Sequence, residues 1–508
     1  MLSRIKSSSV LGIDSHLIEV EVYIASGLPV FSVVGLPDAT VKESKDRVIA
    51  AIRNSGFDFP TRKITVNLAP ADTKKEGAAF DLPIAVGILT ALEKIKSKTV
   101  NDYCMVGELA LDGSLRSIKG ILPIVLGLKK NGISKIIVPQ ENAKEASVVK
   151  DIEVYPVKNL IQTARFINNQ EIIDPFKYAG EEKEENKDSF EIDFSEIKGQ
   201  HFAKRALEIA AAGAHNVLMV GPPGSGKTML AKRLPTILPP FEFDEALDTT
   251  KVHSVAGLTS SSGLVRNRPF RSPHHTISNI ALIGGGTYPK PGEVSLAHNG
   301  VLFLDELTEF HRDVLEVLRQ PLEDKVVSIS RAKSSLKFPA SFMLVGAMNP
   351  CPCGNLGHPN KECICNPYQV MKYRGKISSP LMDRIDMQLE VPALQTQELT
   401  QSTESTGLSS QIRERVINAR KKQYERFKGT KIYNNSQMNS KHIKKYCKID
   451  KESKDLLVNA IDRLSLSARA YDRILKVSRT IADLEQRENI SSSDIAEAIQ
   501  YRNMDKLQ

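Results

Sequence analysis

The chain has 508 residues and a formal net charge of +9, so we expect about two to four domains and a basic surface compatible with nucleic acid. Its hydrophobic content of 41% and charged content of 25% are ordinary for a soluble globular protein. The first residues lack the apolar core of a secretory signal, and no apolar run approaches the roughly 18 residues of a membrane span. We therefore expect a cytoplasmic protein with no membrane partner and with reduced cysteines.

Residues 1–172 predict a mixed α/β domain. The segments 17–24 and 64–68 alternate apolar and polar side chains, as half-buried strands do. Segments 38–53 and 79–92 have helical apolar spacing. The acidic run that follows predicts a linker at 173–193.

This N-terminal region resembles the peptidase domain of Lon-type proteases, which implies an S5 domain 2-like α/β fold. In the segment 75–81, Ala79 stands where that family has its nucleophilic serine, and Leu122 stands at the position of the general-base lysine. A base without its serine cannot form an acyl-enzyme. We expect no peptidase activity here, and the domain serves instead as a scaffold or a DNA-facing ring.

Residues 221–228 fill every position of the phosphate-loop motif G-x-x-x-x-G-K-[ST]. An apolar run at 216–220 precedes them as a buried strand, and 229–238 follows with helical character. The glycines let backbone N–H groups surround phosphates, Lys227 is expected to reach the β- and γ-phosphates, and the Thr228 hydroxyl is expected to bind Mg²⁺. The predicted ATP-binding loop comprises Gly221, Pro222, Pro223, Gly224, Ser225, Gly226, Lys227 and Thr228.

Two further apolar strands end in polar residues. The strand at 301–304 leads to Asp305, expected to hold the Mg²⁺ hydration shell, and to Glu306, expected to polarise the attacking water. These acids could instead cap the next helix. The strand at 342–348 ends at Asn349. Together with the phosphate loop, this pattern predicts hydrolysis of ATP with Mg²⁺.

Three basic segments are candidates for DNA binding. Segment 326–338 predicts two short strands around a turn in which Arg331 and Lys333 would meet backbone phosphates, unless the hairpin is merely solvated. Arg271 is a second candidate, beside His274 and His275. These histidines could instead bind zinc or bond internally. The basic stretch 413–428 is the third candidate, and a solvated face is its alternative.

The sequence concentrates four cysteines in one short segment, Cys351, Cys353, Cys363 and Cys365. Reduced thiolates at this density favour a tetrahedral Zn²⁺ site. The C-x-C spacing is tighter than the usual C-x₂₋₄-C. Structural thiols or a redox pair are therefore the alternatives.

The C-terminal part predicts helices. A polar stretch at 395–411 precedes helical segments at 451–464, 468–486 and 491–501, and Ser491 supplies an N-cap for the last. The predicted organisation is an N-terminal domain at 1–172, a linker at 173–193, an ATPase core at 194–394 and a helical lid at 395–508.

The order of these landmarks resembles the AAA+ ATPases, and more narrowly the magnesium-chelatase-like competence proteins of the ComM/YifB type. The segments 268–278, 284–298 and 349–354 carry the narrower resemblance, which covers essentially the whole chain. It implies a parallel-sheet phosphate-loop core and a helical lid, with Asn349 orienting the water and Ile197, Gly199 and Gln200 packing on the adenine.

The same resemblance assigns roles to two arginines. Arg384 stands where this branch carries the arginine finger that a neighbouring subunit supplies, although it could simply pair with Asp383 or Asp386 on the surface. Arg469 stands at the second sensor position, and Arg473 competes for that role.

The function that the resemblance implies is a hexameric motor that drives branch migration of DNA during natural transformation. Its partners would be further copies of the chain and branched or single-stranded DNA bound without sequence preference. A protein-remodelling or regulatory ATPase and a metal-chelatase motor subunit are the alternatives. Stimulation of ATP hydrolysis by DNA distinguishes the motor from both.

Overall fold

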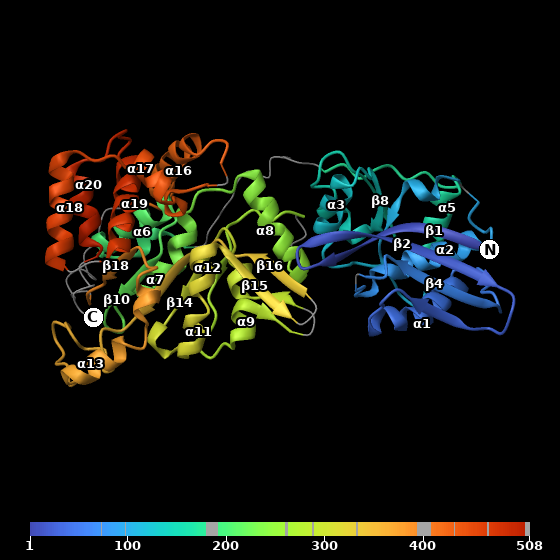
Figure 1. The fold of residues 1–508 in the computed structure, drawn as a ribbon, viewed down its shortest axis with the longest axis horizontal. Helices are drawn as coiled ribbons and strands as arrows, with labels where there is room; N and C mark the ends of the chain where they lie inside the picture. Colours follow the sequence, from blue (N-terminus) through green and yellow to red (C-terminus); the bar gives the residue numbers. More distant parts are fainter. Residues whose placement is uncertain are drawn as a thin grey trace. The chain divides into compact units, whose positions relative to one another are not determined.

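The computed structural model divides the chain into two units (Figure 1). It describes residues 1–508 except 73, 97, 179–191, 260–262, 287–288, 332–333, 394–407, 431, 465–466 and 503–508. The first unit joins Met1–Glu185 to Ala246–Val265 and Ala332–Lys337. The second joins Asn186–Glu245, Arg266–Arg331 and Phe338–Gln508. The finer boundaries expected at 172, 193 and 394 stay predictions.

A seven-stranded mixed sheet organises the first unit, in the order β3-β4-β2-β1-β5-β8-β9. Antiparallel pairs join β1 to β2 and β2 to β4, and the outer strands add in parallel. Alternate side chains of β2 are buried, as the alternating sequence predicted. The strands are β1 (Leu2–Leu11), β2 (Asp14–Ala25), β3 (Phe31–Val34), β4 (Lys63–Ala69), β5 (Cys104–Met105), β8 (Lys135–Pro139) and β9 (Glu153–Val157), with a small ladder of β6 (Glu108–Leu109) and β7 (Leu115–Arg116).

The helices of the first unit have the predicted apolar faces. Asp38 caps the first helix by accepting a 2.8 Å hydrogen bond from the Val41 backbone N–H, and the following helix is buried along nearly its whole length. The mixed α/β fold expected for this region is therefore confirmed. The helices are α1 (Ala39–Asn54), α2 (Asp81–Ala91), α3 (Ile121–Lys130), α4 (Ala143–Ala146) and α5 (Leu160–Ile167).

A five-stranded parallel sheet organises the second unit, in the order β11-β14-β17-β10-β18. All four residues of β10 and of β14 are buried, as strands covered on both faces must be. Parallel strands place their carboxyl ends at one edge, so the polar residues that follow them gather there. The strands are β11 (Phe270–Arg271), β14 (Val301–Leu304), β17 (Met343–Met348), β10 (Val217–Val220) and β18 (Met387–Glu390).

One predicted helix of this core is shorter than expected. The segment 229–238 was expected to have helical character. The α-helix α7 (Lys227–Arg233) begins at the phosphate loop and gives way to a 3₁₀ turn at Leu234–Ile237, so only part of the segment is α-helical. Pro235 explains the change, because its ring cannot donate the next helical hydrogen bond. The other helices of this unit are α6 (His201–Gly213), α9 (Asn279–Ile283), α10 (Glu293–Leu296), α11 (Arg312–Glu316), α12 (Arg319–Asp324), α13 (Pro367–Arg374) and α14 (Ser379–Met382). The helix α8 (Phe243–Ala256) begins in this unit, and its residues from Ala246 onward belong to the first unit.

Two small ladders remain, β12 (Gly284–Gly285) with β13 (Lys290–Pro291) and β15 (Val326–Arg331) with β16 (Ser334–Pro339). The residues Ser334–Lys337 of β16 belong to the first unit. The ladder of β15 with β16 is the hairpin that the alternating pattern predicted. Its turn residue Lys333 lies outside the described residues, and the Arg331 side chain is likewise not described.

The C-terminal part is helical, as predicted. The α6 helix packs against both α16 and α19 and also contacts β18 (Figure 1). Ser491 is the N-cap of the last helix, and its backbone N–H donates a 2.8 Å hydrogen bond to Asp494 Oδ2. The helices are α16 (Ser409–Arg426), α17 (Ser440–Tyr446), α18 (Lys451–Leu464), α19 (Ala468–Leu484) and α20 (Ser492–Gln500). Within the described ranges, none of the helices combines the length and apolar character needed to cross a bilayer.

Candidate functional site

The predicted magnesium ligands meet at the carboxyl edge of the parallel sheet. Thr228 lies in the first turn of α7, and its Oγ1 donates a 2.7 Å hydrogen bond to Oδ2 of Asp305, which follows β14. Gly224 and Gly226 have φ values of 79° and 91°, which side chains disfavour. These glycines let the loop turn tightly enough to bring Thr228 beside Asp305.

Lys227 lies folded over the phosphate loop. Its Nζ donates to the carbonyl oxygens of Gly221 at 2.6 Å and Pro222 at 2.9 Å, and it lies 3.5 Å from Asn349 Oδ1. Burial lowers the pKa of Lys227 below its usual value, and the Asp305 carboxylate opposes that shift. The structure therefore brings together the tips of β10, β14 and β17, as the sequence predicted.

Glu306, the predicted base, has a contact that the sequence left open. His275 Nδ1 lies 3.5 Å from Glu306 Oε2, and the His274 ring lies 4.1 Å from the His275 ring. Glu306 has a φ of 50°, a backbone conformation that is costly for a residue other than glycine. The two histidines thus lie beside the predicted base. The described residues that could form a metal group are the four cysteines and do not include these histidines.

The segment predicted to pack on the adenine is tied to the phosphate loop. Gln200 Nε2 donates to the carbonyl oxygens of Ser225 at 3.3 Å and Pro392 at 2.8 Å. Ile197 is buried, and Gly199 has a φ of 58°. A movement of this segment would therefore be transmitted to the loop that holds the phosphates.

The predicted arginine finger forms an ion pair with a carboxylate that the sequence did not identify. Arg384 contacts the Glu323 carboxylate rather than Asp383 or Asp386, and its Nη1 donates a 2.6 Å hydrogen bond to the Pro380 carbonyl oxygen. The sequence-based alternative, a pair of Arg384 with Asp383 or Asp386, therefore named the wrong partner. Arg384 and Glu323 line a hollow of about 580 Å³, although the Arg384 side chain itself is only 12% exposed.

The two candidates for the second sensor differ in environment. Arg469 is exposed and lies 3.8 Å from Asp383 Oδ2. Arg473 forms an ion pair with the buried Asp386. Burial opposes ionisation of Asp386, but Arg473, His215 and a backbone N–H outweigh it and hold the pKa of Asp386 well below its usual range. Arg473 thus has a structural role as the partner of a buried carboxylate, whereas the Arg469 side chain is exposed.

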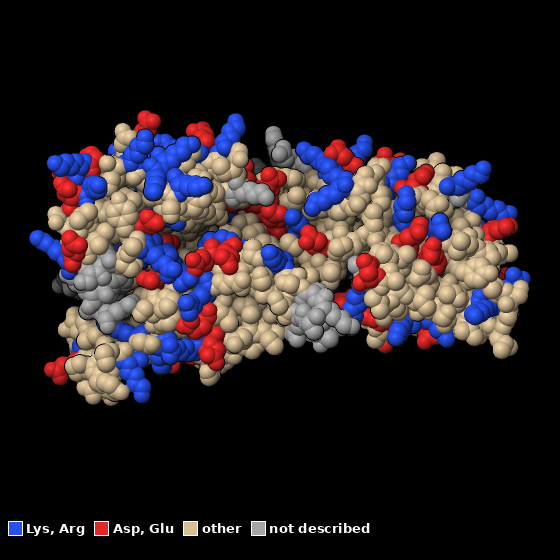
Figure 2. Space-filling view, in the orientation of Figure 1, with Lys and Arg blue, Asp and Glu red and all other residues tan. Residues whose placement is uncertain are grey.

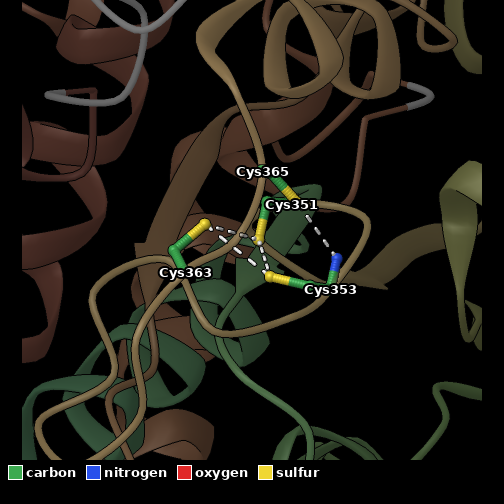
Figure 3. Close-up of side chains that lie close together, drawn as sticks. All are labelled: Cys351, Cys353, Cys363 and Cys365. Carbon is green, nitrogen blue, oxygen red and sulfur yellow. Dashed lines mark hydrogen bonds between the residues drawn. The ribbon is translucent and has the colours of Figure 1, made fainter.

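The four predicted metal-binding cysteines converge in one cluster (Figure 3). The Sγ atom of Cys351 lies 3.4 Å from that of Cys353, and Cys363 Sγ lies 3.7 Å from both. The Cys353 backbone N–H donates to Cys365 Sγ at 3.4 Å, and all four sulfur atoms lie within 4.8 Å of one another. Four sulfurs around one Zn²⁺ at about 2.3 Å would be about 3.8 Å apart, so the cluster fits that ion closely. The Asn355 backbone N–H lowers the pKa of the Cys353 thiol to about 6, whereas burial and the neighbouring thiols outweigh a backbone hydrogen bond and raise the pKa values of Cys363 and Cys365.

Several basic residues proposed for DNA binding have intramolecular partners. Arg271 donates to both Glu293 carboxylate oxygens, at 2.6 and 2.7 Å, and this pairing raises the pKa of Arg271. In α16, Arg420 is buried and donates to the Ala212 carbonyl oxygen at 2.8 Å, and Arg426 pairs with Asp483. These contacts favour a structural role for much of the basic stretch 413–428.

The peptidase-like region carries apolar side chains at both predicted catalytic positions. Ala79 lies in a 3₁₀ turn before α2, where its carbonyl oxygen accepts a 2.9 Å hydrogen bond from the Gly107 N–H. Leu122 is buried in α3, and its N–H donates to Glu145 Oε1 at 3.3 Å. These two positions therefore supply neither a nucleophile nor a base.

Comparison with known proteins agrees with this geometry. The chain matches three families, "Magnesium chelatase, subunit ChlI" over residues 193–399, "Subunit ChlI of Mg-chelatase" over 20–142 and "Magnesium chelatase, subunit ChlI C-terminal" over 406–502. It is also 26% identical over 160 residues to the Lon protease of Azorhizobium caulinodans, which covers 29% of this chain and 18% of that protease.

Two full-length relatives narrow the assignment. The chain is 45% identical over 511 residues to the competence protein ComM of Haemophilus influenzae, covering 100% of this chain and 98% of that protein. It is 41% identical over 507 residues to the uncharacterized protein YifB of Escherichia coli K12, with the same coverage. The chain therefore belongs to the magnesium-chelatase-like AAA+ ATPase family that includes ComM and YifB.

Proposed function

We propose that this protein is a ring-forming motor that couples ATP hydrolysis to branch migration of DNA recombination intermediates during natural transformation. The observation that carries the proposal is the convergence of Thr228, Asp305 and Asn349 around Lys227 at the sheet edge. This arrangement supports hydrolysis of a nucleoside triphosphate. The full-length similarity to a competence protein supports DNA as the molecule that the motor moves.

The residues divide the work of hydrolysis. Lys227 would bind the β- and γ-phosphates, Thr228 would bind Mg²⁺, and Asp305 would hold the hydration shell of that ion, which neutralises charge on the phosphates when bound. Glu306 accepts a proton from the attacking water, which Asn349 orients. Arg384 stabilises charge on the γ-phosphate in the site of a neighbouring subunit, with Arg469 as the sensor on the lid side. Such a finger is worth roughly 10³–10⁵ in rate and requires a ring, for which we propose six subunits.

DNA contact is proposed for the β15–β16 hairpin, through Arg331 and Lys333, with Arg271 as a second contact. Lysine and arginine side chains also gather over α16 and α17 on the face shown in Figure 2. Exposed lysines on these two helices, or just after α16, include Lys421, Lys428, Lys441 and Lys444. Phosphate contacts of this kind bind DNA without reading its sequence and weaken as salt rises.

We also propose that Zn²⁺ is the metal of the cysteine cluster. Four thiolates form the closed tetrahedral donor set of structural zinc sites and leave no position for a reacting water. The ion would therefore support the fold rather than take part in hydrolysis.

The test is ATP hydrolysis measured with and without branched DNA, using Glu306→Gln as the inactive control. A DNA motor hydrolyses ATP several-fold faster with DNA than without it. A rate indifferent to DNA would contradict the proposal and favour a protein-remodelling or regulatory ATPase. A chelatase motor subunit would likewise ignore DNA and would require a separate catalytic subunit.

A further inference from the structure

The cysteine-rich segment 351–365, which we call the cysteine knuckle, lies directly against the phosphate loop. Gly354 has a φ of 78°, and a Cβ atom built on it would lie 2.6 Å from Pro223 Cδ and 2.9 Å from Pro223 Cγ. No side chain fits between these two residues. The Gly354 backbone is therefore the surface on which the Pro223 ring rests.

The knuckle has little packing of its own. It adjoins a hollow of about 730 Å³ that it shares with the phosphate loop, lined by Gly221 and Pro222 on one side and by Leu356, Gly357 and Cys365 on the other. The Ile364 side chain is 85% exposed, and Leu356 is 37% exposed. A segment with so few buried apolar groups needs another constraint to hold one shape, and a metal is the usual one in small structural units.

The remaining contacts place this constraint next to the catalytic residues. Cys351 follows Asn349 by two residues, and the intervening Pro350 carbonyl oxygen accepts a 3.1 Å hydrogen bond from Arg374 Nε of α13. Cys365 directly precedes Asn366, whose side chain caps α13 by accepting from the Gln369 N–H at 2.8 Å. Hydrogen bonds to α13 therefore anchor both ends of the knuckle. The conformation of the residues between its ends depends on the four thiols.

We propose that a divalent, thiophilic metal ion, Zn²⁺, held by the four cysteines fixes the knuckle against Pro223, so that metal occupancy sets the affinity of the phosphate loop for ATP. The coordinated knuckle is a rigid support on the outer side of the loop. Without the ion, Gly354 no longer packs against Pro223. The phosphate loop then samples conformations in which its backbone N–H groups do not surround the phosphates. This inference rests on the proposed nucleotide site and adds a metal-dependent control to it.

The first test uses two glycines of the knuckle that share a backbone conformation. Gly357 has a φ of 76°, but its added Cβ would meet only Glu390 Oε1, at 3.9 Å. Gly354→Ala and Gly357→Ala therefore impose the same left-handed strain, and only the first pushes on Pro223. We expect Gly354→Ala to weaken binding of a fluorescent ATP analogue at least tenfold while Gly357→Ala changes it less than twofold. Equal effects of the two substitutions would overturn the proposal.

The second test varies the metal in the full-length wild-type protein. We expect about one zinc per chain after purification without chelator. Releasing the zinc with a thiol-reactive mercurial, followed by chelator and reductant, should weaken binding of the analogue at least tenfold. Readdition of zinc chloride should restore the affinity, whereas magnesium chloride should not, and circular dichroism should show that the helical content persists.

The outcomes separate this proposal from the motor itself. Wild-type protein that binds the analogue equally well with and without zinc would overturn the metal-dependent support and leave the motor intact. Zinc below half an equivalent, with no uptake of added zinc, would overturn it as well. Wild-type protein that binds no nucleotide in either state would refute the nucleotide site on which the proposed function depends.

Discussion

Thr228 Oγ1 donates a hydrogen bond of 2.7 Å to Asp305 Oδ2, and the two residues are 77 positions apart in the chain. The contact exists because β17 pairs in parallel with both β10 and β14, so that all three strands end at one edge. A hydroxyl and a carboxylate in this relationship can share one octahedral Mg²⁺, which prefers oxygen ligands. We therefore propose this contact as the magnesium site of ATP hydrolysis.

Removing either partner should abolish magnesium-dependent turnover. We expect Thr228→Ala and Asp305→Asn each to lower the rate of ATP hydrolysis at saturating nucleotide by about 10²-fold or more, because the metal loses a ligand. Thr228→Ser keeps the hydroxyl and should keep most of the activity. Steady-state hydrolysis at varied magnesium concentration measures the effect, and full activity in Thr228→Ala would contradict the assignment.

Replacing the base should separate binding from chemistry. Glu306→Gln keeps the size of the side chain but cannot accept the proton, so we expect turnover to fall by about 10²–10⁴-fold with nucleotide affinity unchanged. Equilibrium binding of a fluorescent ATP analogue and single-turnover hydrolysis measure the two quantities. Normal turnover in this variant would show that another group activates the water.

Two inactive variants should rescue each other if Arg384 acts across a subunit interface. Glu306→Gln subunits cannot hydrolyse ATP but still offer Arg384 to a neighbour, and Arg384→Ala subunits have the opposite defect. In randomly mixed rings about a quarter of the sites combine an intact base with an intact arginine, so about a quarter of wild-type activity should return. An absence of rescue in verified mixed rings would contradict the role of Arg384 as a finger.

The two lid arginines should behave differently although they lie one helical turn apart. Arg473→Ala removes the arginine partner of the buried Asp386 carboxylate and leaves it with only weaker partners such as His215 and a backbone N–H, and breaking such a buried pair costs about 3–5 kcal/mol. Its melting temperature should therefore fall sharply. Arg469→Ala removes an exposed side chain and should lower turnover with little change in melting. Thermal melting and hydrolysis assays on both variants check this, and the reverse pattern would make Arg473 the sensor.

Local sequence patterns were enough to predict the elements that carry the chemistry. The motif at 221–228 and the apolar runs ending at Asp305 and Asn349 specify strands and a loop whose geometry hardly varies, because buried parallel strands allow few alternatives. The ends of helices were harder. Pro235 ended α7 earlier than expected, although a proline in a helical pattern is itself a recognisable stop signal.

Contacts between distant segments could not be predicted in this way. Pairings such as His275 with Glu306 or Arg384 with Glu323 depend on how loops pack after the sheet has formed, and no local period encodes them. The close contact between Gly354 and Pro223 likewise depends on how the loops pack. The cysteine spacing could be read from the sequence, but the convergence of its four sulfurs needed the structure.

The most direct test of the account is ATP-dependent strand exchange on a labelled three-way DNA junction, with Glu306→Gln as the matched control. The account predicts that the wild-type protein moves the branch point only when ATP is hydrolysed, and that Glu306→Gln binds the junction without moving it. No movement by wild-type protein that hydrolyses ATP at a rate indifferent to DNA would contradict the account and direct the search toward a protein client.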